Sequence, residues 1–338
     1  MPHERLAIIT QSDGLSEPAG AAVITDPAEL LALLELDPAL LAPAREAARL
    51  FPIRVPRTYV QRMRKGDPDD PLLRQVLGSI RETETVAGFS QDPLAEQDAS
   101  PAPGILHKYQ GRVLLMVSST CGVHCRYCFR RHFPYDNHGL HGQALEQALA
   151  WLRAHPEVDE VILSGGDPLV LSDRRLAALL DALARLPTLR RLRIHSRQPV
   201  VMPERLTEAL QQQLLGFPQP VTLVLHSNHP RELDQTLARA LAPLRQGVTL
   251  LNQSVLLAGV NDDEQVLATL SERLFDVGVL PYYLHLLDPV AGAAHFQVPI
   301  ERARDLHRAL QARLPGYLVP RLVQELAGRP AKTLVSAD

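Results

Sequence analysis

The sequence is poor in cysteine, in aromatic residues and in uncompensated charge. Three cysteines in 338 residues exclude a disulfide-bonded scaffold. No run reaches the roughly 18 apolar residues that a membrane span needs, and the start, MPHERLAIITQ, lacks the basic-then-apolar order of a signal peptide. The 35 basic and 38 acidic residues leave a net charge of -3, which argues against a nucleic-acid partner. We therefore expect a cytoplasmic protein.

The amino-terminal third has helical patterns in short pieces. A hydrophobic content of 46% with 22% charged residues is typical of a folded protein with a large core. From about residue 26 to 80, short segments begin at Pro or Asp-Pro, a favoured helix start. The polar, proline-rich residues 81–105 predict an ordered loop or linker. The expected helices have the sequences TDPAELLALLEL, DPALLAPAREAARLF, PRTYVQRMRKG and DPDDPLLRQVL.

Beyond residue 105, short apolar runs alternate with amphipathic segments. The runs are RVLLMVS, EVILSGG, LRIHSR, VTLVLHS, VTLLNQS and LPYYLHL, which start at 112, 160, 192, 221, 248 and 280. Four helical patterns lie between them, DRRLAALLDALARL, PERLTEALQQQLL, LDQTLARALAPLRQ and DEQVLATLSERLFDVG. This alternation predicts a parallel sheet with right-handed crossovers, and six units favour a partial (β/α)6 TIM-like barrel over an open sheet. The expected division is an amino-terminal helical extension with linker (1–105), the barrel core (106–300) and a carboxyl-terminal helical segment (301–338).

Polar residues follow every predicted strand. The six runs end in SSTCGVHC, SGGDP, HSRQP, HSNHP, NQS and HLLDP. In parallel α/β folds the ligand lies beyond the carboxyl ends of the strands, so these segments predict one site there. His195 and Arg197 belong to these segments without an assigned role.

The three cysteines lie within eight positions, in CGVHCRYC. A structural zinc site needs four protein ligands, and His124 or His132 would have to be the fourth. A four-iron cluster held by three thiolates instead leaves one iron open for a small molecule that supplies its own ligand atoms. The spacing of Cys121, Cys125 and Cys128 favours the cluster over zinc.

These residues resemble the signature of the radical S-adenosylmethionine (SAM) superfamily. The C-x-x-x-C-x-x-C spacing after the first strand and the SGGDPL turn after the second are both typical of it. More of the chain is similar to the lysine 2,3-aminomutases, through CRYCFRR, HSRQPVVMPERL, NQSVLLAGVND, PYYLHLLDPVAGAAHF and GYLVPRL. FPIRVPRTYVQRM, GDPDDPLLRQVL and CFRRHFPY resemble the shorter bacterial branch that makes (R)-β-lysine for elongation factor P.

The resemblance implies a radical SAM barrel with three cofactors, a [4Fe-4S] cluster, SAM and pyridoxal phosphate (PLP). Lys332 in GRPAK would be the catalytic lysine that carries PLP. Free-lysine mutases have a run of glycines before that lysine, whereas this chain has LAGRPAK. The remaining implied roles are cluster ligation by Cys121, Cys125 and Cys128; cofactor binding by Arg112, Tyr109, Gly165, Gly166, Asp167, His226 and Gln253; and substrate binding by Arg130, Asp288 and Glu325.

The resemblance also implies the reaction and its partners. The substrate would be L-α-lysine, an electron donor of the flavodoxin or ferredoxin type would reduce the cluster, and the product would reach elongation factor P through its lysyl ligase. A homo-oligomer is compatible with the sequence. Two alternatives stay open, a metabolic free-lysine 2,3-aminomutase and a zinc-bound structural module on a silent barrel. Glu325, an aspartate in the free-lysine enzymes, and the end of the chain six residues after Lys332 count against the first.

Overall fold

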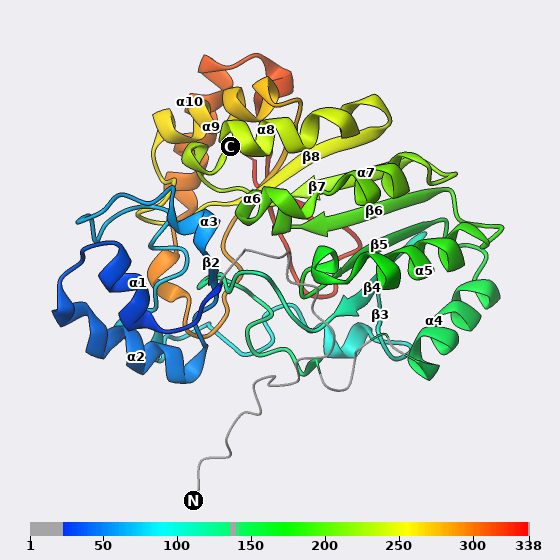
Figure 1. Ribbon diagram of the computed structural model, residues 1–338, viewed down its shortest axis with the longest axis horizontal. Helices are drawn as coiled ribbons and strands as arrows, with labels where there is room; N and C mark the ends of the chain where they lie inside the picture. Colours follow the sequence, from blue (N-terminus) through cyan, green and yellow to red (C-terminus); the bar gives the residue numbers. More distant parts are fainter. Residues whose placement is uncertain (1–22, 136–139, 141, 337–338) are drawn as a thin grey trace, which may run out of the picture.

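A nine-stranded curved sheet forms the centre of the molecule (Figure 1). The computed structural model describes residues 23–135, 140 and 142–336, so the expected absence of a signal peptide concerns residues outside this part. The strand order is β11-β10-β9-β8-β7-β6-β5-β4-β3. The strands are β3 (Ile105–Tyr109), β4 (Arg112–Ser118), β5 (Glu160–Gly165), β6 (Arg191–Ser196), β7 (Val221–Leu225), β8 (Val248–Val255), β9 (Leu280–His285), β10 (Arg321–Gln324) and β11 (Thr333–Leu334).

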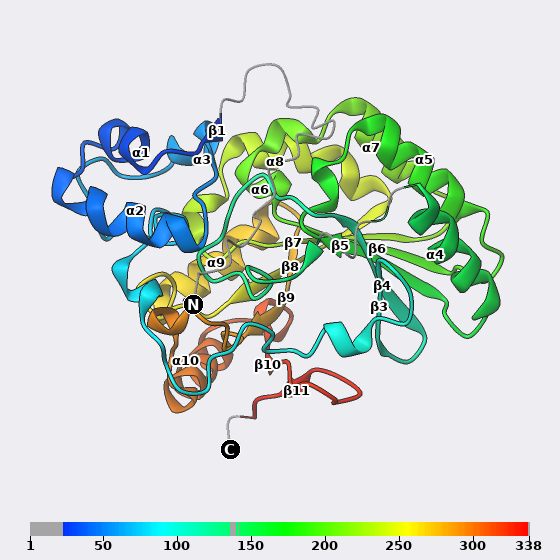
Figure 2. The ribbon, with the colours of Figure 1, turned by 90° about the horizontal axis from the view of Figure 1, so that it is seen from below.

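The sheet is a barrel that stays open along one side. Neighbouring strands from β4 to β10 are parallel, whereas the two edge strands β3 and β11 pair antiparallel with β4 and β10. Figure 2 shows β10 and β11 on the same side of the molecule as β3, and in the described residues no ladder joins these edges. The predicted partial (β/α)6 barrel is thereby confirmed.

The six predicted strands correspond to β4 through β9. Their outward-facing apolar residues, such as Leu115, Leu163 and Leu223, are buried against the helices, whereas residues on the other face line the barrel interior. The prediction missed β3, β10 and β11. These strands are short or antiparallel, and they do not belong to the repeating strand-helix alternation.

Helices line the outer face of the sheet (Figures 1 and 2). In α5, Leu176, Leu179, Leu180 and Leu183 are buried, which is the three-and-four spacing that the sequence showed. In the described part of the chain, no helix is both long and apolar enough to cross a membrane. The outer helices are α4 (Gln143–Ala154), α5 (Asp173–Ala184), α6 (Gln198–Val201), α7 (Glu208–Leu215), α8 (Gln235–Leu241), α9 (Glu264–Asp276) and α10 (Ile300–Arg313).

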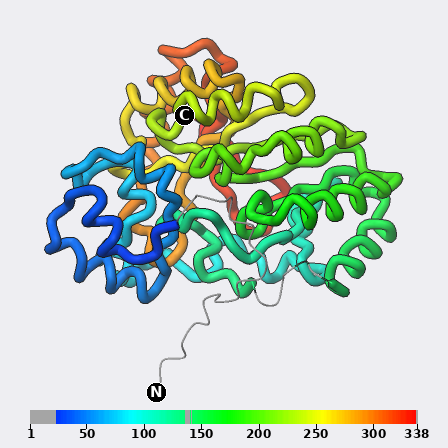
Figure 3. Tube along the Cα trace, in the orientation of Figure 1, coloured from blue at the N-terminus to red at the C-terminus, as the bar shows by residue number. Residues whose placement is uncertain are grey.

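The amino-terminal extension packs beside the barrel, as the blue segment of Figure 3 shows. It contains a two-stranded sheet of β1 (Val23–Ile24) and β2 (Val55–Pro56) and the helices α1 (Pro27–Leu33), α2 (Leu41–Leu50) and α3 (Arg57–Val60). Its apolar core includes Val123 of the cysteine loop (residues 119–135) and Val201 of α6. The extension and the barrel therefore share a core.

One predicted helix is wrong. Residues 67–77, DPDDPLLRQVL, form successive turns instead of a regular helix. The buried carboxylate of Asp70 accepts hydrogen bonds from the backbone N–H groups of Leu72 and Leu73 at 2.8 and 3.1 Å, as a helix N-cap does, but no regular helix follows it. The backbone carbonyl oxygen of Gln75 accepts the N–H of Arg126 at 2.9 Å, so it bonds to the cysteine loop and not to a further helical turn.

Candidate active site

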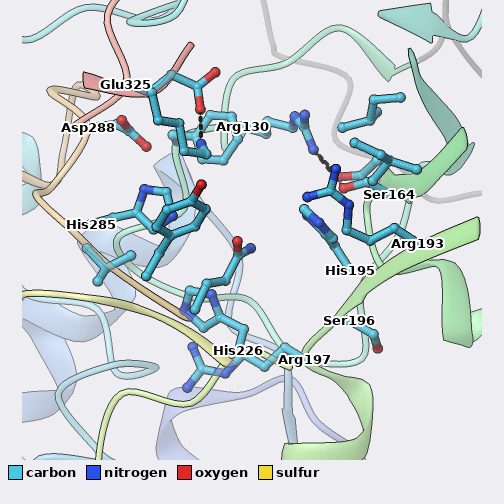
Figure 4. Close-up of a pocket in the computed structure, with 18 of the residues that line it drawn as sticks. Arg130, Ser164, Arg193, His195, Ser196, Arg197, His226, His285, Asp288 and Glu325 are labelled. Atoms are coloured by element: carbon cyan, nitrogen blue, oxygen red, sulfur yellow. Dashed lines mark hydrogen bonds and ion pairs between the residues drawn. The ribbon is translucent and has the colours of Figure 1, made fainter. Parts of the chain in front are cut away.

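A cavity of about 810 Å³ occupies the barrel interior and reaches the carboxyl ends of the strands. In Figure 4, His195, His226 and His285 point into this space from three different strand ends. The cavity gathers every site residue that the sequence predicted. These are Cys121, Cys125, Cys128, Tyr109, Arg112, Arg130, Gly165, Gly166, Asp167, His226, Gln253, Asp288, Glu325 and Lys332.

The three cysteines are free thiols in the cysteine loop. Burial raises the pKa of the Cys128 thiol to about 11 and that of Cys121 well above its usual range. Thiols in this environment need a strong positive charge to become thiolates, and a metal centre supplies one. In the described part of the chain, no three His, Cys, Asp or Glu side chains are arranged to hold one metal ion. A cluster makes a different demand, because each thiolate binds a separate iron.

The histidines considered as zinc ligands have other partners. His124 Nδ1 lies 2.9 Å from the carbonyl oxygen of Pro52, and His132 Nε2 lies 3.2 Å from that of Ala291. Neither ring is part of the cavity wall. The donor set at the cavity is therefore three thiols, which fits an iron–sulfur cluster with one open iron.

The SGGDP turn places β5 against the end of β4. Gly165 has φ +115, and a Cβ atom there would lie 2.6 Å from the carbonyl oxygen of Ser118. A Cβ atom on Gly166 would lie 2.1 Å from the carbonyl oxygen of Thr120, just before Cys121. Both glycines are thus required for close backbone packing. Their predicted contact with SAM stays a prediction.

Asp167 of the same turn organises the start of the next loop. Its buried carboxylate accepts hydrogen bonds from Ser196 Oγ at 2.7 Å and from the backbone N–H groups of Arg197 and Gln198 at 2.7 and 2.9 Å. It also caps the turn that follows, through the N–H of Leu169 at 2.9 Å. The structure gives Asp167 a structural role, and its contribution to cofactor binding stays a prediction.

Charged side chains form a chain of ion pairs across the open side of the barrel. Lys108 on β3 donates to Glu325, just after β10, at 2.7 Å, and Lys332 donates to the second oxygen of that carboxylate. Lys108 also lies 3.4 Å from Glu96, whose carboxylate accepts from Arg130 Nε at 2.6 Å and Nη2 at 2.8 Å. Burial alone would raise the pKa of Glu325, but the two lysines hold it below its usual range.

A tight hairpin brings Lys332 to this position. Strand β11 pairs antiparallel with β10, with Gln324 opposite Thr333, and Gly328 takes φ +74 in the turn between them. The LAGRPAK segment therefore folds back without a glycine run. Lys332 lies opposite Glu325 as a result.

Asp288 differs from the other carboxylates of the cavity. Among the described residues, its side chain has no hydrogen-bond or ion-pair partner that would hold it as an anion. Burial, together with the charge of Glu325, raises its pKa to about 7, and Lys332 and Lys108 only partly offset this. An unpaired carboxylate that faces a cavity is suited to a cationic ligand.

Two further predicted residues line the cavity close to the cysteine loop. His226 Nε2 lies 2.9 Å from the hydroxyl of Tyr127, and burial lowers the pKa of the imidazole to about 3, so the ring is neutral. Gln253 extends from β8 into the same space. Within the part of the chain that the structure describes, neither residue is engaged in an ion pair that would keep it from a bound cofactor.

Tyr109 and Arg112 belong to the edge strand β3 and to the start of β4. The guanidinium carbon of Arg112 lies 4.6 Å above the Tyr109 ring. Burial, with the charge of Glu325, raises the pKa of the Tyr109 phenol. Across the cavity, His195 Nε2 is buried and has no partner among the described residues, so it is available to a bound group.

Sequence reasoning missed Glu96 and gave Lys108 no role. Glu96 lies in the expected linker, in DPLAEQD, where an acidic residue normally faces water. A local pattern cannot reveal a buried glutamate whose partners are Arg130 and Lys108. His285 is the first residue of the predicted strand end HLLDP, but no spacing in the sequence distinguishes it.

The comparisons with known proteins agree with this geometry. A family model described as a 4Fe-4S single cluster domain matches residues 109–191. A partial parallel barrel with three clustered thiols at its cavity defines an iron–sulfur enzyme of the radical SAM class.

The particular family follows from the relatives. The chain is 54% identical over 316 residues to the L-lysine 2,3-aminomutase of Escherichia coli (strain K12), covering 93% of this chain and 92% of that protein. It is 48% identical to the one of Haemophilus influenzae, over 92% of both chains. The enzyme of Clostridium subterminale is 37% identical over 82% of this chain and 67% of its own length. The chain belongs to the lysine 2,3-aminomutase family, which makes it an isomerase.

A radical SAM methyltransferase from Sphaerobacter thermophilus is a solved structure with a partly similar chain path. The TM-score is 0.44 at 19% sequence identity, over 65% of this chain and 68% of that chain.

The cofactors of the lysine 2,3-aminomutases are a [4Fe-4S] cluster, SAM and PLP.

Proposed function

We propose that this protein converts L-α-lysine to (R)-β-lysine in a PLP-dependent reaction, and that the product serves the modification of elongation factor P. The observation that carries the proposal is the convergence of Lys332, Asp288 and the three cysteines on one cavity. The cavity thus holds a candidate attachment point for PLP, an anion for the substrate side chain and the ligands of a cluster.

The proposed chemistry explains why the site lies inside the barrel. Held by Cys121, Cys125 and Cys128, a [4Fe-4S] cluster with SAM would supply radical chemistry at C3 of lysine, and PLP held by Lys332 would supply the group through which the nitrogen moves from C2 to C3. An aliphatic C–H bond has no acidity for a general base to use. The protein's own residues therefore act by holding lysine in position and by excluding water.

The charges of the cavity residues indicate where the two charged ends of lysine would bind. The ε-ammonium of lysine would pair with Asp288, the carboxylate without a partner, while Glu325 is already neutralised by Lys108. The substrate carboxylate would take the Nη1 edge of Arg130. That edge faces Ser164 Oγ at 3.2 Å, whereas the opposite edge of the guanidinium is held by Glu96.

Lys332 is the proposed attachment point for PLP. Its amine faces Glu325 in the cavity, where Arg112 would bind the phosphate through bidentate hydrogen bonds. Lys108, the other cavity lysine, is committed to Glu96 and Glu325 and is the internal alternative. Tyr109 would lie near the PLP ring.

The link to elongation factor P rests on the resemblance of three segments to the shorter bacterial branch. Two of these segments, FPIRVPRTYVQRM and GDPDDPLLRQVL, contribute to the apolar core that contains Val123 of the cysteine loop. The proposal places the enzyme in the cytoplasm with a flavodoxin- or ferredoxin-type electron donor and the lysyl ligase of elongation factor P. The division of the chain into an extension (1–105), a barrel core (106–300) and a carboxyl-terminal segment (301–338) is also part of the proposal.

An anaerobic assay with SAM, PLP and a reductant tests the reaction, with chiral separation of α- and β-lysine. We expect (R)-β-lysine from the wild type and none from Lys332→Arg, while Lys65→Arg, at an exposed ion pair with Glu35, should keep activity. Borohydride reduction followed by peptide mapping should label Lys332. A label on Lys108 would overturn the assignment of Lys332 as the attachment point, but it would leave the proposed reaction untouched.

Two further results separate the alternatives. A mass increase on elongation factor P, when product and lysyl ligase are added, supports the proposed pathway. Turnover of lysine without such transfer favours the metabolic enzyme. A colourless, zinc-only protein from anaerobic purification would contradict both enzymatic functions.

A further inference from the structure

Arg197 is a buried arginine at the end of β6 that makes a direct contact with the cysteine loop. Its Nη1 donates a hydrogen bond to the Cys125 sulfur at 3.0 Å. The same atom contacts the hydroxyl of Tyr127, two residues further along the loop. Figure 4 shows Arg197 close to His226 at the edge of the cavity.

The position of the guanidinium is fixed from its other side. Nη2 donates to Gln75 at 2.8 Å and to Glu232 at 2.9 Å, and it lies 3.2 Å from the hydroxyl of Tyr59. The backbone N–H of Arg197 is held by Asp167 at 2.7 Å. Arg197 therefore cannot move away from the sulfur without breaking several buried hydrogen bonds.

The counter-ion Glu232 is itself saturated. Its carboxylate accepts from Tyr59 at 2.6 Å, from Ser227 Oγ at 2.8 Å and from the N–H of Asn228 at 2.6 Å. Replacement of Arg197 therefore leaves Glu232 with several donors. A variant without the guanidinium is expected to fold for this reason.

We infer that Arg197 is a positioning residue for the cluster, which holds Cys125 in place and sets the cluster's reduction potential. A hydrogen bond and a positive charge at a cluster sulfur favour the reduced form, since reduction adds one negative charge to the centre. Glu232, on the side of Arg197 away from the sulfur, lowers the net positive charge that Cys125 experiences. This inference depends on the cluster and not on the identity of the substrate.

A purely structural ion pair would leave the midpoint potential of the cluster unchanged, whereas the proposed role of Arg197 predicts the direction in which each substitution shifts it. The couple is the one-electron reduction of [4Fe-4S]2+ to [4Fe-4S]+, with dithionite as the electron source. Arg197→Gln removes the positive charge and should make the midpoint potential more negative. Glu232→Gln removes the opposing charge and should make it less negative, whereas Arg197→Lys should stay closer to the wild type.

The experiment is an EPR-monitored redox titration of the anaerobically reconstituted protein. Arg308→Gln is the matched control, since it also removes one arginine charge, but from an exposed ion pair with Asp305 on α10, and its potential should equal that of the wild type. Iron and sulfide content and the thermal midpoint of the metal-free protein report cluster loading and folding separately. The potential is measured without lysine or PLP, so failure of the proposed reaction leaves this test intact.

An Arg197→Gln protein with full iron content and an unchanged potential would overturn the inference. Should Arg197→Gln lose the cluster altogether, Glu232→Gln decides the matter. An unchanged or more negative potential in Glu232→Gln would also overturn the inference. A purely structural role for the network does not predict potential shifts of opposite sign in Arg197→Gln and Glu232→Gln.

Discussion

Replacement of Glu82 by alanine is expected to destabilise the protein by about 3–5 kcal/mol and to lower its iron content. Glu82 lies in the 3-10 helix η2 (Ile80–Thr83), and its side chain is 0% exposed. It accepts hydrogen bonds from Arg126 Nε at 2.8 Å and Nη2 at 2.5 Å, and from Arg131 Nη2 at 2.8 Å. Because these arginines flank Cys128, the substitution leaves two buried cations of the cysteine loop without their counter-ion.

The magnitude follows from burial. Removing one partner of a buried ion pair typically costs about 3–5 kcal/mol, because the remaining charge stays desolvated. Arg126 keeps its bond to the carbonyl oxygen of Phe51 at 2.6 Å, which favours the lower end of that range. The pair Arg308–Asp305, with side chains 58% and 55% exposed, should contribute less than about 1 kcal/mol. Asp305→Ala is therefore the matched control.

Urea unfolding of the metal-free protein measures the difference. Fluorescence of Trp151, the only tryptophan, reports on the barrel through α4, and far-UV circular dichroism reports on the whole chain. Linear extrapolation then gives the free energy of unfolding where the two probes coincide. A loss for Glu82→Ala no larger than the loss for Asp305→Ala would refute the reasoning. Iron content after reconstitution should fall in Glu82→Ala alone.

Three further predictions concern the cavity. Asp288→Asn should raise the KM for lysine roughly 30-fold, because loss of a buried charge partner costs about 2 kcal/mol or more, while the cluster's visible absorption stays unchanged. In the wild type, kcat/KM for lysine should rise with pH up to about 7 and then level off as Asp288 ionises, and Asp288→Asn should remove this rise. Because the pKa of Asp288 is higher in the folded protein than in the unfolded chain, the folded protein keeps this carboxyl protonated to higher pH. The contribution of Asp288 to the free energy of unfolding should therefore fall as pH rises from about 4 to 7. Gly166→Ala should reduce cluster content, since its Cβ would lie 2.1 Å from the Thr120 carbonyl oxygen, whereas Gly316→Ala, with nothing within 4 Å, should not.

The barrel strands could be predicted because their burial is two-sided. A strand such as Val221–Leu225 has four buried apolar residues among its five, so its sequence alone sets it apart from the amphipathic helices around it. Strand β11, Thr333–Leu334, has only two residues, and its pairing depends on the turn at Gly328. Turn geometry of this kind is not visible in hydrophobic periodicity, and so the path to Lys332 could not be derived.

The residues of the candidate site likewise include some that local sequence reveals and some that it does not. Cys121, Asp288 and their neighbours lie at strand ends or in a dense motif, and both features are local in sequence. The pairing of Glu96 with Arg130 joins residues 34 positions apart, and that of Lys108 with Glu325 joins residues 217 apart. Such contacts follow from closure of the barrel edges, which a local pattern does not contain.

The amino-terminal extension is explained by what the cysteine loop lacks. The described part of that loop has no long helix or strand of its own, so its backbone needs support from elsewhere. The extension provides this support at two points, directly through Glu82 to Arg126, and indirectly through Gln75 to Arg197, which in turn contacts Cys125. Both contacts are buried and charged, which makes them costly to break and specific in geometry. A loop that must present three sulfurs in fixed positions therefore depends on the extension, and loss of either contact should affect the cluster before it affects the barrel.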